Sequence, residues 1–275
     1  MDYVELNIPI PTSEMGEIIT AELADFPFES FKEEGEQLKA YIPQERLADC
    51  KEKVDEVLAC YEVRGARYIS IETQNWNAQW ESNFEVVEVG SEILIRAPFH
   101  APNPAFRTEV VIMPKMSFGT GHHATTHLMS EMITKIDLAG KRGLDMGSGT
   151  GVLAIIAVKY GAEAVDAVDI DEWAYENCCE NIEQNGVADR IKPFWGGVSL
   201  IDGANYDFIL ANINRNILLS DMESYVATLR QGGSLLMSGF FVEDIAPLRQ
   251  KAESLGLTFV GHSERDGWAV VEFRR

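Results

Sequence analysis

Residues 141–171, KRGLDMGSGTGVLAIIAVKYGAEAVDAVDID, decide the fold of this chain. The run from Gly143 to Met146 is short and apolar and ends at a glycine, as buried parallel strands do. Residues 147–151 alternate glycine with serine and threonine, which lets the backbone turn sharply and lets a ligand approach without meeting a Cβ atom. Residues 152–159 then have the composition of a buried helix, which Gly161 ends. The stretch predicts a strand, a glycine loop and a helix.

A second strand follows this helix. It covers residues 163–168, and Asp169 stands at its carboxyl end. A strand, loop, helix and strand of this kind form a nucleoside-binding half of a doubly wound α/β sheet, whose ligand lies at the carboxyl ends of the strands. An acid at the tip of the second strand is placed to accept hydrogen bonds from both ribose hydroxyls. We therefore predict a ligand that contains a nucleoside and lies beside Asp169.

The spacing of the glycines favours one class of nucleoside ligand. A dinucleotide fingerprint has the pattern G-x-G-x-x-G, but Val152 stands at the position of its third glycine. Asp145 precedes the loop and would repel a pyrophosphate, whereas it can help to hold the ammonium group of S-adenosylmethionine, directly or through water. We therefore predict S-adenosylmethionine as the cofactor. The alternative is a glycine turn with a purely structural role. Such a turn would not need an acid such as Asp169 at the tip of the next strand.

The rest of the C-terminal region predicts a sheet that ends in an antiparallel hairpin. Apolar runs predict further strands at residues 191–195, 206–211 and 234–238. The last two runs, at 257–262 and 268–273, are joined by a tight Asp-Gly turn. A hairpin that ends a parallel sheet is typical of the seven-stranded, Rossmann-like class I methyltransferases and not of dinucleotide dehydrogenases. We therefore predict an α/β methyltransferase domain over residues 84–275.

The first 74 residues have a pattern of their own. Their apolar runs and helix caps predict the order strand, helix, strand, strand, helix, strand, which is the ferredoxin-like arrangement of a small α+β domain. We find no catalytic constellation there and assign residues 1–74 to substrate recognition, with a purely structural role as the alternative. Residues 75–83 form the expected linker to the larger domain.

The charge of the chain limits its partners. It has 275 residues, with 23 basic against 44 acidic side chains and a formal net charge of −21. Such a surface repels nucleic acid phosphates and attracts basic proteins, although solubility alone would also explain it. We therefore expect a basic partner and no direct contact with nucleic acid.

The sequence carries no signal for a membrane or for secretion. No apolar run is long enough to span a bilayer, and the N-terminus lacks the basic start and apolar core of a signal peptide. The four cysteines are not spaced as zinc ligands and are typical of reduced thiols. We expect a monomeric cytoplasmic protein.

Two further polar segments accompany the glycine loop. Residues 115–126 place glycines and hydroxyls before an expected helix, which suits a carboxylate or another polar ligand group. The histidines of this region, His122, His123 and His127, lack a nearby acid or cysteine to complete a metal site, so we predict no metal. Asn212 ends a central strand beside the loop, where the methyl acceptor is expected.

Four segments together resemble the ribosomal protein L11 methyltransferase (PrmA) family. They are SFGTGHHATT at 117–126, DMGSGTG at 145–151, DID at 169–171 and ANI at 211–213. The first segment is the specific one, since the glycine loop alone identifies only the superfamily. The family usually has Thr-His-Pro where this chain has His122-His123-Ala124, and often has cysteine at the position of Ser148. The resemblance covers most of residues 76–275, and the small leading domain also fits it.

The resemblance implies a protein methyltransferase. The enzyme would transfer methyl groups from S-adenosylmethionine to lysine and N-terminal amino groups of L11, a basic protein of the large ribosomal subunit. By match to the motifs, the residues implied to contact the cofactor are Thr126, Gly147, Asp169 and Asn212, with Phe118, Gly119 and Gly149 as neighbours. The alternatives left open are a methyltransferase for RNA or another protein, a nicotinamide oxidoreductase, and a ribosome-assembly module without turnover.

The expected reaction needs a neutral amine. A free lysine has a pKa of about 10.4, and burial against apolar walls lowers that pKa. No histidine or carboxylate stands out as a base, so we predict that none is essential and that catalysis is mainly positioning and desolvation. Asn212 is the predicted catalytic residue, because its side-chain or backbone oxygen can accept an amine N–H and orient the lone pair. Alternatively, Asn212 only holds the cofactor and does not orient the amine.

Overall fold

The chain folds into two compact units, which we describe separately. Met1–Asn83 form the first unit and Phe84–Arg275 the second. Most of the expected linker, residues 75–80 and 82, lies outside the described residues. The computed structural model describes residues 2–71, 81, 83–115 and 117–275.

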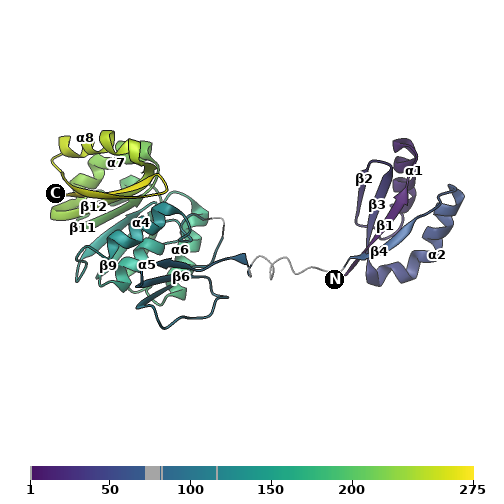
Figure 1. Cartoon of the computed structure of the whole chain (residues 1–275), viewed down its shortest axis with the longest axis horizontal. Coiled ribbons are helices and arrows are strands. Elements are labelled where there is room, and N and C mark those ends of the chain that lie inside the picture. Colours follow the sequence, from purple (N-terminus) through teal and green to yellow (C-terminus); the bar gives the residue numbers. More distant parts are fainter. Residues whose placement is uncertain (1, 72–80, 82, 116) are drawn as a thin grey trace. The chain divides into compact units, whose positions relative to one another are not determined.

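The first unit is a four-stranded antiparallel sheet with two helices, in the strand order β2-β3-β1-β4 (Figure 1). Every second side chain of β1 is buried, which directs its apolar residues into a core shared with both helices. Thr12 caps α1 by accepting a hydrogen bond from the Met15 amide. The order of elements is the predicted ferredoxin-like one. They are β1 (Tyr3–Pro9), α1 (Ser13–Leu23), β2 (Ser30–Glu34), β3 (Gln37–Pro43), α2 (Gln44–Cys60) and β4 (Arg67–Ile71).

The second unit is built on a seven-stranded sheet in the order β10-β9-β8-β11-β12-β14-β13. Neighbouring strands are parallel as far as β12, and β14 pairs antiparallel with both β12 and β13. This hairpin at the end of a parallel sheet confirms the predicted fold class. The strands are β8 (Arg142–Met146), β9 (Ala164–Asp169), β10 (Ile191–Trp195), β11 (Tyr206–Asn212), β12 (Leu229–Phe241), β13 (Thr258–Arg265) and β14 (Trp268–Arg274).

Helices cover both faces of this sheet, and each face has its own core (Figure 1). Alternate residues of β11 show the division, since Phe208 belongs to the core under α4, α5 and α6, and Ile209 to the core under α7 and α8. Helix α5 is buried from Val152 to Val158, which explains its uniformly apolar sequence. The helices are α4 (Ala124–Ile133), α5 (Val152–Lys159), α6 (Glu172–Gln184), α7 (Arg215–Thr228) and α8 (Ile245–Ser254).

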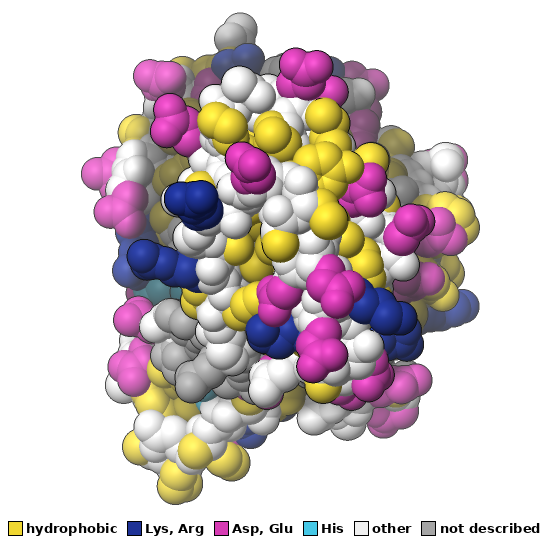
Figure 2. Space-filling model, turned by 90° about the vertical axis from the view of Figure 1, so that its right-hand side faces the viewer, with side chains coloured by type: hydrophobic (Ala, Val, Ile, Leu, Met, Phe, Trp, Pro, Cys, Tyr) yellow, Lys and Arg dark blue, Asp and Glu magenta, His cyan; other side chains and the backbone are white. Residues whose placement is uncertain are grey.

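A separate three-stranded sheet packs against the first of these cores. It consists of β5 (Val87–Val89), β6 (Ile93–Arg96) and β7 (Thr108–Val111), with β7 at its edge. Figure 2 views the molecule from the right-hand side of Figure 1 and shows Asp and Glu side chains spread over that face, with Lys, Arg and hydrophobic side chains between them. Within the described ranges, no helix has the length and apolarity that crossing a membrane would require.

One close contact between neighbouring strands depends on a glycine. Gly143 on β8 pairs with Phe208 on β11, and the Phe208 ring covers the Gly143 backbone. A Cβ atom on Gly143 would lie 2.0 Å from Phe208 Cζ. Because Phe208 is itself buried, its ring cannot move without displacing the surrounding core.

We expect Gly143→Ala to lower the free energy of unfolding by about 1–3 kcal/mol, the usual cost of an overpacked core. Urea denaturation followed by circular dichroism measures this change. Gly261→Ala is the matched control, because Gly261 lies in a strand and has no atom within 4 Å of the added Cβ. Equal effects of the two substitutions would contradict the role given to the Phe208 ring.

Candidate functional site

The glycine loop between β8 and α5 turns in a conformation that side chains rarely adopt. Gly147 has a φ of +73° and Gly149 a φ of +54°. A Cβ atom on Gly147 would lie 2.1 Å from Ile213 Cγ2, and one on Gly149 would lie 2.3 Å from the Phe118 carbonyl oxygen. The sequence suggested that these glycines make room for a ligand. In the structure, the atoms that a Cβ on either glycine would meet belong to Ile213 and Phe118 and not to a ligand.

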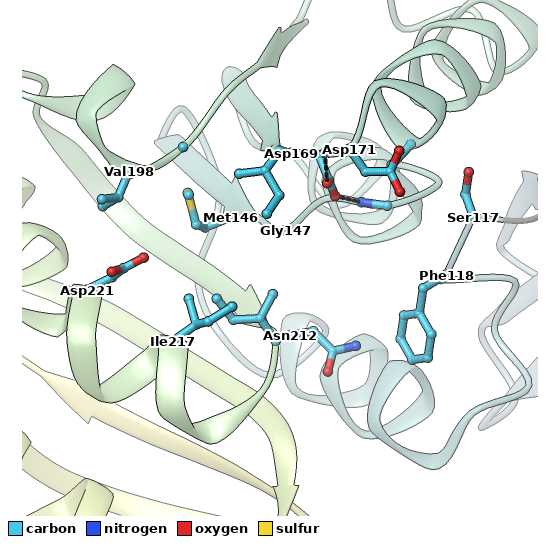
Figure 3. Close-up of a pocket in the computed structure, with 15 residues that line it drawn as sticks. Ser117, Phe118, Met146, Gly147, Asp169, Asp171, Val198, Asn212, Ile217 and Asp221 are labelled. Carbon is cyan, nitrogen blue, oxygen red and sulfur yellow. Dashed lines mark hydrogen bonds between the residues drawn. The ribbon is translucent and has the colours of Figure 1, made fainter.

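A cavity of about 480 Å³ opens at the carboxyl ends of β8, β9 and β11 (Figure 3). This is the edge of the sheet at which doubly wound folds bind ligands. Its lining joins the glycine loop to the tips of these strands and to α7. The lining residues are Ser117, Phe118, Met146, Gly147, Gly149, Asp169, Ile170, Asp171, Ala174, Gly197, Val198, Asn212, Ile213, Ile217 and Asp221.

Asp169 is held in this cavity by backbone amides. Its Oδ2 accepts a hydrogen bond of 2.8 Å from the Gly149 amide, and its Oδ1 accepts one of 3.0 Å from the Asp171 amide (Figure 3). The side chain is half-buried and lines the cavity. A carboxylate oxygen has lone pairs for more than one donor. Asp169 can therefore keep both backbone contacts and still accept hydrogen bonds from a ligand.

Asp145, the second acid of the motif, lies within β8 and not at the open edge of the sheet. It is fully buried and is not among the residues that line the cavity. Its Oδ2 accepts a hydrogen bond of 3.0 Å from the Ala154 amide in the first turn of α5, so it caps that helix from the neighbouring strand. Burial raises the pKa of Asp145 to about 7.

The segment 117–121, which we call the Phe118 loop, lies against the glycine loop. The Thr150 amide donates to the Phe118 carbonyl at 2.9 Å, and the Thr150 hydroxyl donates to the Gly119 carbonyl at 2.6 Å. These bonds place the Phe118 ring, which is 53% exposed, at the wall of the cavity. Gly119 does not line the cavity, because its φ of +105° turns it onto Thr150.

Among the residues that the sequence singled out, three buried oxygen atoms have no hydrogen-bond partner within the described part of the chain. They are Thr126 Oγ1, Asp145 Oδ1 and Asn212 Oδ1. Asn212 lines the cavity itself, and Asp145 immediately precedes the lining residue Met146. Thr126 lies in the first turn of α4 and is fully buried, so it does not line the cavity. Buried polar atoms are usually paired, so Asn212 Oδ1 is available to a polar ligand in the cavity.

A second cavity of about 260 Å³ adjoins the first. The two share Phe118, Asn212 and Ile213 as a common wall. The second cavity is also lined by His123 and Trp268, whose rings lie 4.7 Å apart in an edge-to-face arrangement. A group in the second cavity would therefore lie close to a ligand of the first, beside Phe118, Asn212 and Ile213.

Sequence reasoning found part of this site. The predicted residues Phe118, Gly147, Gly149, Asp169 and Asn212 line the first cavity, whereas Thr126 and Gly119 do not. It missed the lining residues Asp171, Ile217 and Asp221. Asp171 could have been found as the neighbour of Asp169 that caps α6, because its side chain accepts from the Trp173 amide. Ile217 and Asp221 lie one turn apart on α7, and no local signal distinguishes them from other helix residues.

The histidines of the region have structural partners. His122 Nε2 contacts the Glu85 carbonyl at 3.0 Å, and His100 Nε2 contacts the Phe84 carbonyl at 2.7 Å. His123 caps α4 by accepting from the Thr125 amide. Within residues 2–71, 81, 83–115 and 117–275, no group of three or more histidine, cysteine and acidic side chains could hold a metal ion.

The family model and the curated relatives that match this chain carry the same family description. The family model described as "Ribosomal protein L11 methyltransferase (PrmA)" matches residues 14–275. A relative of that name from Porphyromonas gingivalis is 45% identical over 262 residues, which cover 94% of this chain and 90% of the relative. Another from Bacteroides fragilis is 42% identical over 268 residues and covers 95% of each chain. The similarity therefore extends over both units.

A solved structure also shares the fold. It is described as ribosomal protein L11 methylase from Lactobacillus delbrueckii subsp. bulgaricus. Its TM-score is 0.65, and the match covers 70% of this chain and 99% of that chain. At 24% identity, this likeness supports the architecture and nothing finer.

The buried position of Asp145 predicts a pH dependence of stability. Its pKa of about 7 in the folded protein exceeds the unfolded value of about 3.9, so folding favours the protonated form. The stabilisation is complete below the unfolded pKa and is lost as pH rises through the folded one. We expect the free energy of unfolding to fall by on the order of 1 kcal/mol per pH unit in this window, and Asp145→Asn to flatten that slope.

Urea denaturation at a series of pH values from about 4 to 8 measures this slope. Asparagine keeps an oxygen that can accept from the Ala154 amide, so the cap of α5 is preserved. Asp189→Asn is the control, because Asp189 is exposed and we expect it to keep the wild-type slope. An Asp145→Asn protein with an unchanged slope would show that Asp145 stays ionised in the folded state.

Proposed function

The chain belongs to the ribosomal protein L11 methyltransferase (PrmA) family, and we propose on this basis that it transfers methyl groups from S-adenosylmethionine to lysine and N-terminal amino groups of that ribosomal protein. The observation that carries the proposal is the pair of adjoining cavities at the carboxyl edge of the sheet. One of them carries Asp169, and the two share Asn212. A donor of methyl groups and an acceptor can thus meet across one residue.

The first cavity suits the nucleoside part of S-adenosylmethionine. We propose that Asp169 accepts hydrogen bonds from the ribose hydroxyls, since it is fixed by the Gly149 and Asp171 amides and still has free lone pairs. Ile170 is 68% exposed and lines the cavity together with Val198, which supports an apolar surface for the purine ring.

Two of the unpaired oxygens suit the amino acid part of the cofactor. An ammonium group has three donors and no acceptor, and Asn212 Oδ1 is a buried acceptor without a donor in the described structure. The Thr126 hydroxyl can both donate and accept, so it suits either the ammonium or the carboxylate group. We propose that Thr126, Gly147 and Asn212 contact this end of the cofactor, with Phe118, Gly119 and Gly149 around it.

The second cavity is the proposed site of the acceptor amine. Its aromatic rings can pack against the methylene groups of a lysine side chain. Burial there lowers the pKa of the amine and favours its neutral form. When bound, the cofactor supplies an electrophilic methyl group on a sulfonium sulfur. We propose that an Asn212 oxygen accepts an amine N–H and directs the lone pair towards that methyl group, so that catalysis rests on positioning.

The first unit is the proposed site of substrate recognition. We assign this role to residues 1–74, with residues 75–83 as the linker and residues 84–275 as the methyltransferase domain. The net charge of −21 favours a basic protein such as a ribosomal protein over nucleic acid. A ribosomal protein substrate also supports a reaction in the cytoplasm, and we propose that the enzyme acts there as a monomer.

Methyl transfer tests the proposal directly. Purified protein is incubated with methyl-labelled S-adenosylmethionine and undermethylated large-subunit ribosomal proteins, and the label is mapped by mass spectrometry. We expect label on amino groups of L11. Free ribosomal RNA is the second substrate, and label on RNA with none on protein would favour an RNA methyltransferase. Tight cofactor binding without any label would favour a module without turnover.

The role of Asp169 gives a second prediction. Loss of two charge-assisted hydrogen bonds to the ribose costs about 1.5–3 kcal/mol for each bond, so we expect Asp169→Ala to weaken binding of S-adenosylmethionine by about 100-fold or more. Isothermal titration calorimetry measures this affinity. Glu172→Gln is the control, because Glu172 is exposed, lies three residues away and does not line the cavity. An unchanged affinity of Asp169→Ala would refute the ribose assignment.

A further inference from the structure

The segment that leads from β7 into the Phe118 loop has a neighbouring strand on one side only. β7 is the edge strand of the small sheet, and β6 is its partner. The Ile112 amide continues this pairing by donating to the Arg96 carbonyl at 2.9 Å. The backbone groups of Val111 and Met113 point to the opposite side, where α6 lies in place of another strand. With no strand on this side, side chains take over the pairing of these backbone groups.

Two asparagines of α6 and Asn185, which caps its carboxyl end, supply those partners. Asn185 pairs with both backbone groups of Val111, accepting from its amide at 3.0 Å and donating to its carbonyl at 2.7 Å. Asn181 accepts from the Met113 amide at 2.9 Å, and Asn177 donates to the Met113 carbonyl at 3.4 Å. Asn177 and Asn181 are fully buried. Each side-chain amide thus does what the backbone of a neighbouring strand would do.

The spacing of the asparagines explains why a helix can replace a strand here. Residues four apart on a helix are separated by about 6.0 Å along its axis. Residues two apart on a strand are separated by about 6.6 Å. Asn185 and Asn181 therefore advance almost in step with the backbone of Val111 and Met113, and Asn177, one turn earlier, reaches the Met113 carbonyl. We call this set of contacts the asparagine ladder.

The ladder also reaches the glycine loop. Asn181 Nδ2 donates to the Thr150 carbonyl at 3.0 Å while its Oδ1 accepts from Met113. Thr150 in turn donates to the carbonyls of Phe118 and Gly119. An exposed ion pair between Lys115 and Glu180 ties the same segment to α6 once more. The start of the Phe118 loop and the glycine loop are thus held to one helix.

From this geometry we infer that Asn181 and Asn185 are positioning residues for the methyl transfer reaction. They hold residues 111–113 in register with α6 and thereby set where Phe118 stands at the common wall of the two cavities. The inference rests on the proposed function, since it assigns the ladder a role in cofactor binding. The residues do not touch the cavities themselves.

A purely structural role would have a different signature. If the ladder only stabilised the fold, its loss would lower the melting temperature and the active fraction but leave the affinity of the folded protein unchanged. If it positions the Phe118 loop, its loss raises the dissociation constant of the cofactor in protein that is still folded. Amide hydrogen exchange of residues 117–121 would also become faster, because the loop would open more often.

The test compares Asn181→Ala and Asn185→Ala in the full-length protein. Asn185→Ala leaves the contact with the glycine loop intact and affects a half-buried residue, so it tests the ladder if Asn181→Ala fails to fold. We measure binding of S-adenosylhomocysteine by calorimetry and exchange of residues 117–121 by mass spectrometry. Each lost hydrogen bond is expected to weaken binding by about fivefold. Glu183→Gln, an exposed substitution on the same helix, is expected to match the wild type.

The outcomes separate this inference from the proposed function. Weaker binding together with faster exchange in residues 117–121 supports the ladder as a positioning device. Wild-type affinity and exchange in both asparagine variants overturn it, whatever happens to their melting temperature. A wild-type protein that binds neither S-adenosylhomocysteine nor S-adenosylmethionine would refute the proposed function, and exchange of residues 117–121 would still decide whether the ladder holds the loop.

Discussion

The backbone turn at Gly149 is the constraint on which the site depends. Its φ of +54° and the Phe118 carbonyl, 2.3 Å from the place of a Cβ, leave room for glycine only. The Gly149 amide donates to Asp169, which belongs to the neighbouring strand β9. This one residue therefore fixes the distance between the glycine loop, the Phe118 loop and the tip of β9. A side chain there would separate all three and widen the cavity that they enclose.

The two acids of the motif illustrate how position on a strand decides the role of a carboxylate. Asp169 is the last residue of β9 and stands at the open edge of the sheet, where backbone amides orient it toward the cavity. Asp145 is the last but one residue of β8 and is enclosed by the core, where it caps α5 and its pKa rises. One acid is available to a ligand at the surface of the cavity, and the other supports the helix that follows the glycine loop.

The residues shared by the two cavities can position both reactants of the proposed methyl transfer. Phe118 and Asn212 belong to both cavities, although one comes from a loop before α4 and the other from the end of β11. A displacement reaction needs its two partners held close and in line, and much of the barrier can be removed by such positioning. The elements that place Phe118 consequently matter as much as the residues that touch a ligand. They are the glycine loop, through Thr150, and α6, through its asparagines.

The sequence by itself determined the elements and their order. Glycines at 147–151, the acid at 169 and the Asp-Gly turn before β14 are local signals, because turns, caps and buried strands depend on residues close in the chain. It also placed Asp169 and Asn212 at the carboxyl ends of strands, where the structure has them. Only the tertiary structure decided that Asp145 caps α5, that Thr126 is buried and that Ile217 and Asp221 line the cavity. Burial and contact depend on segments that are distant in the sequence and meet only when the sheet is complete, so no local pattern could carry that information.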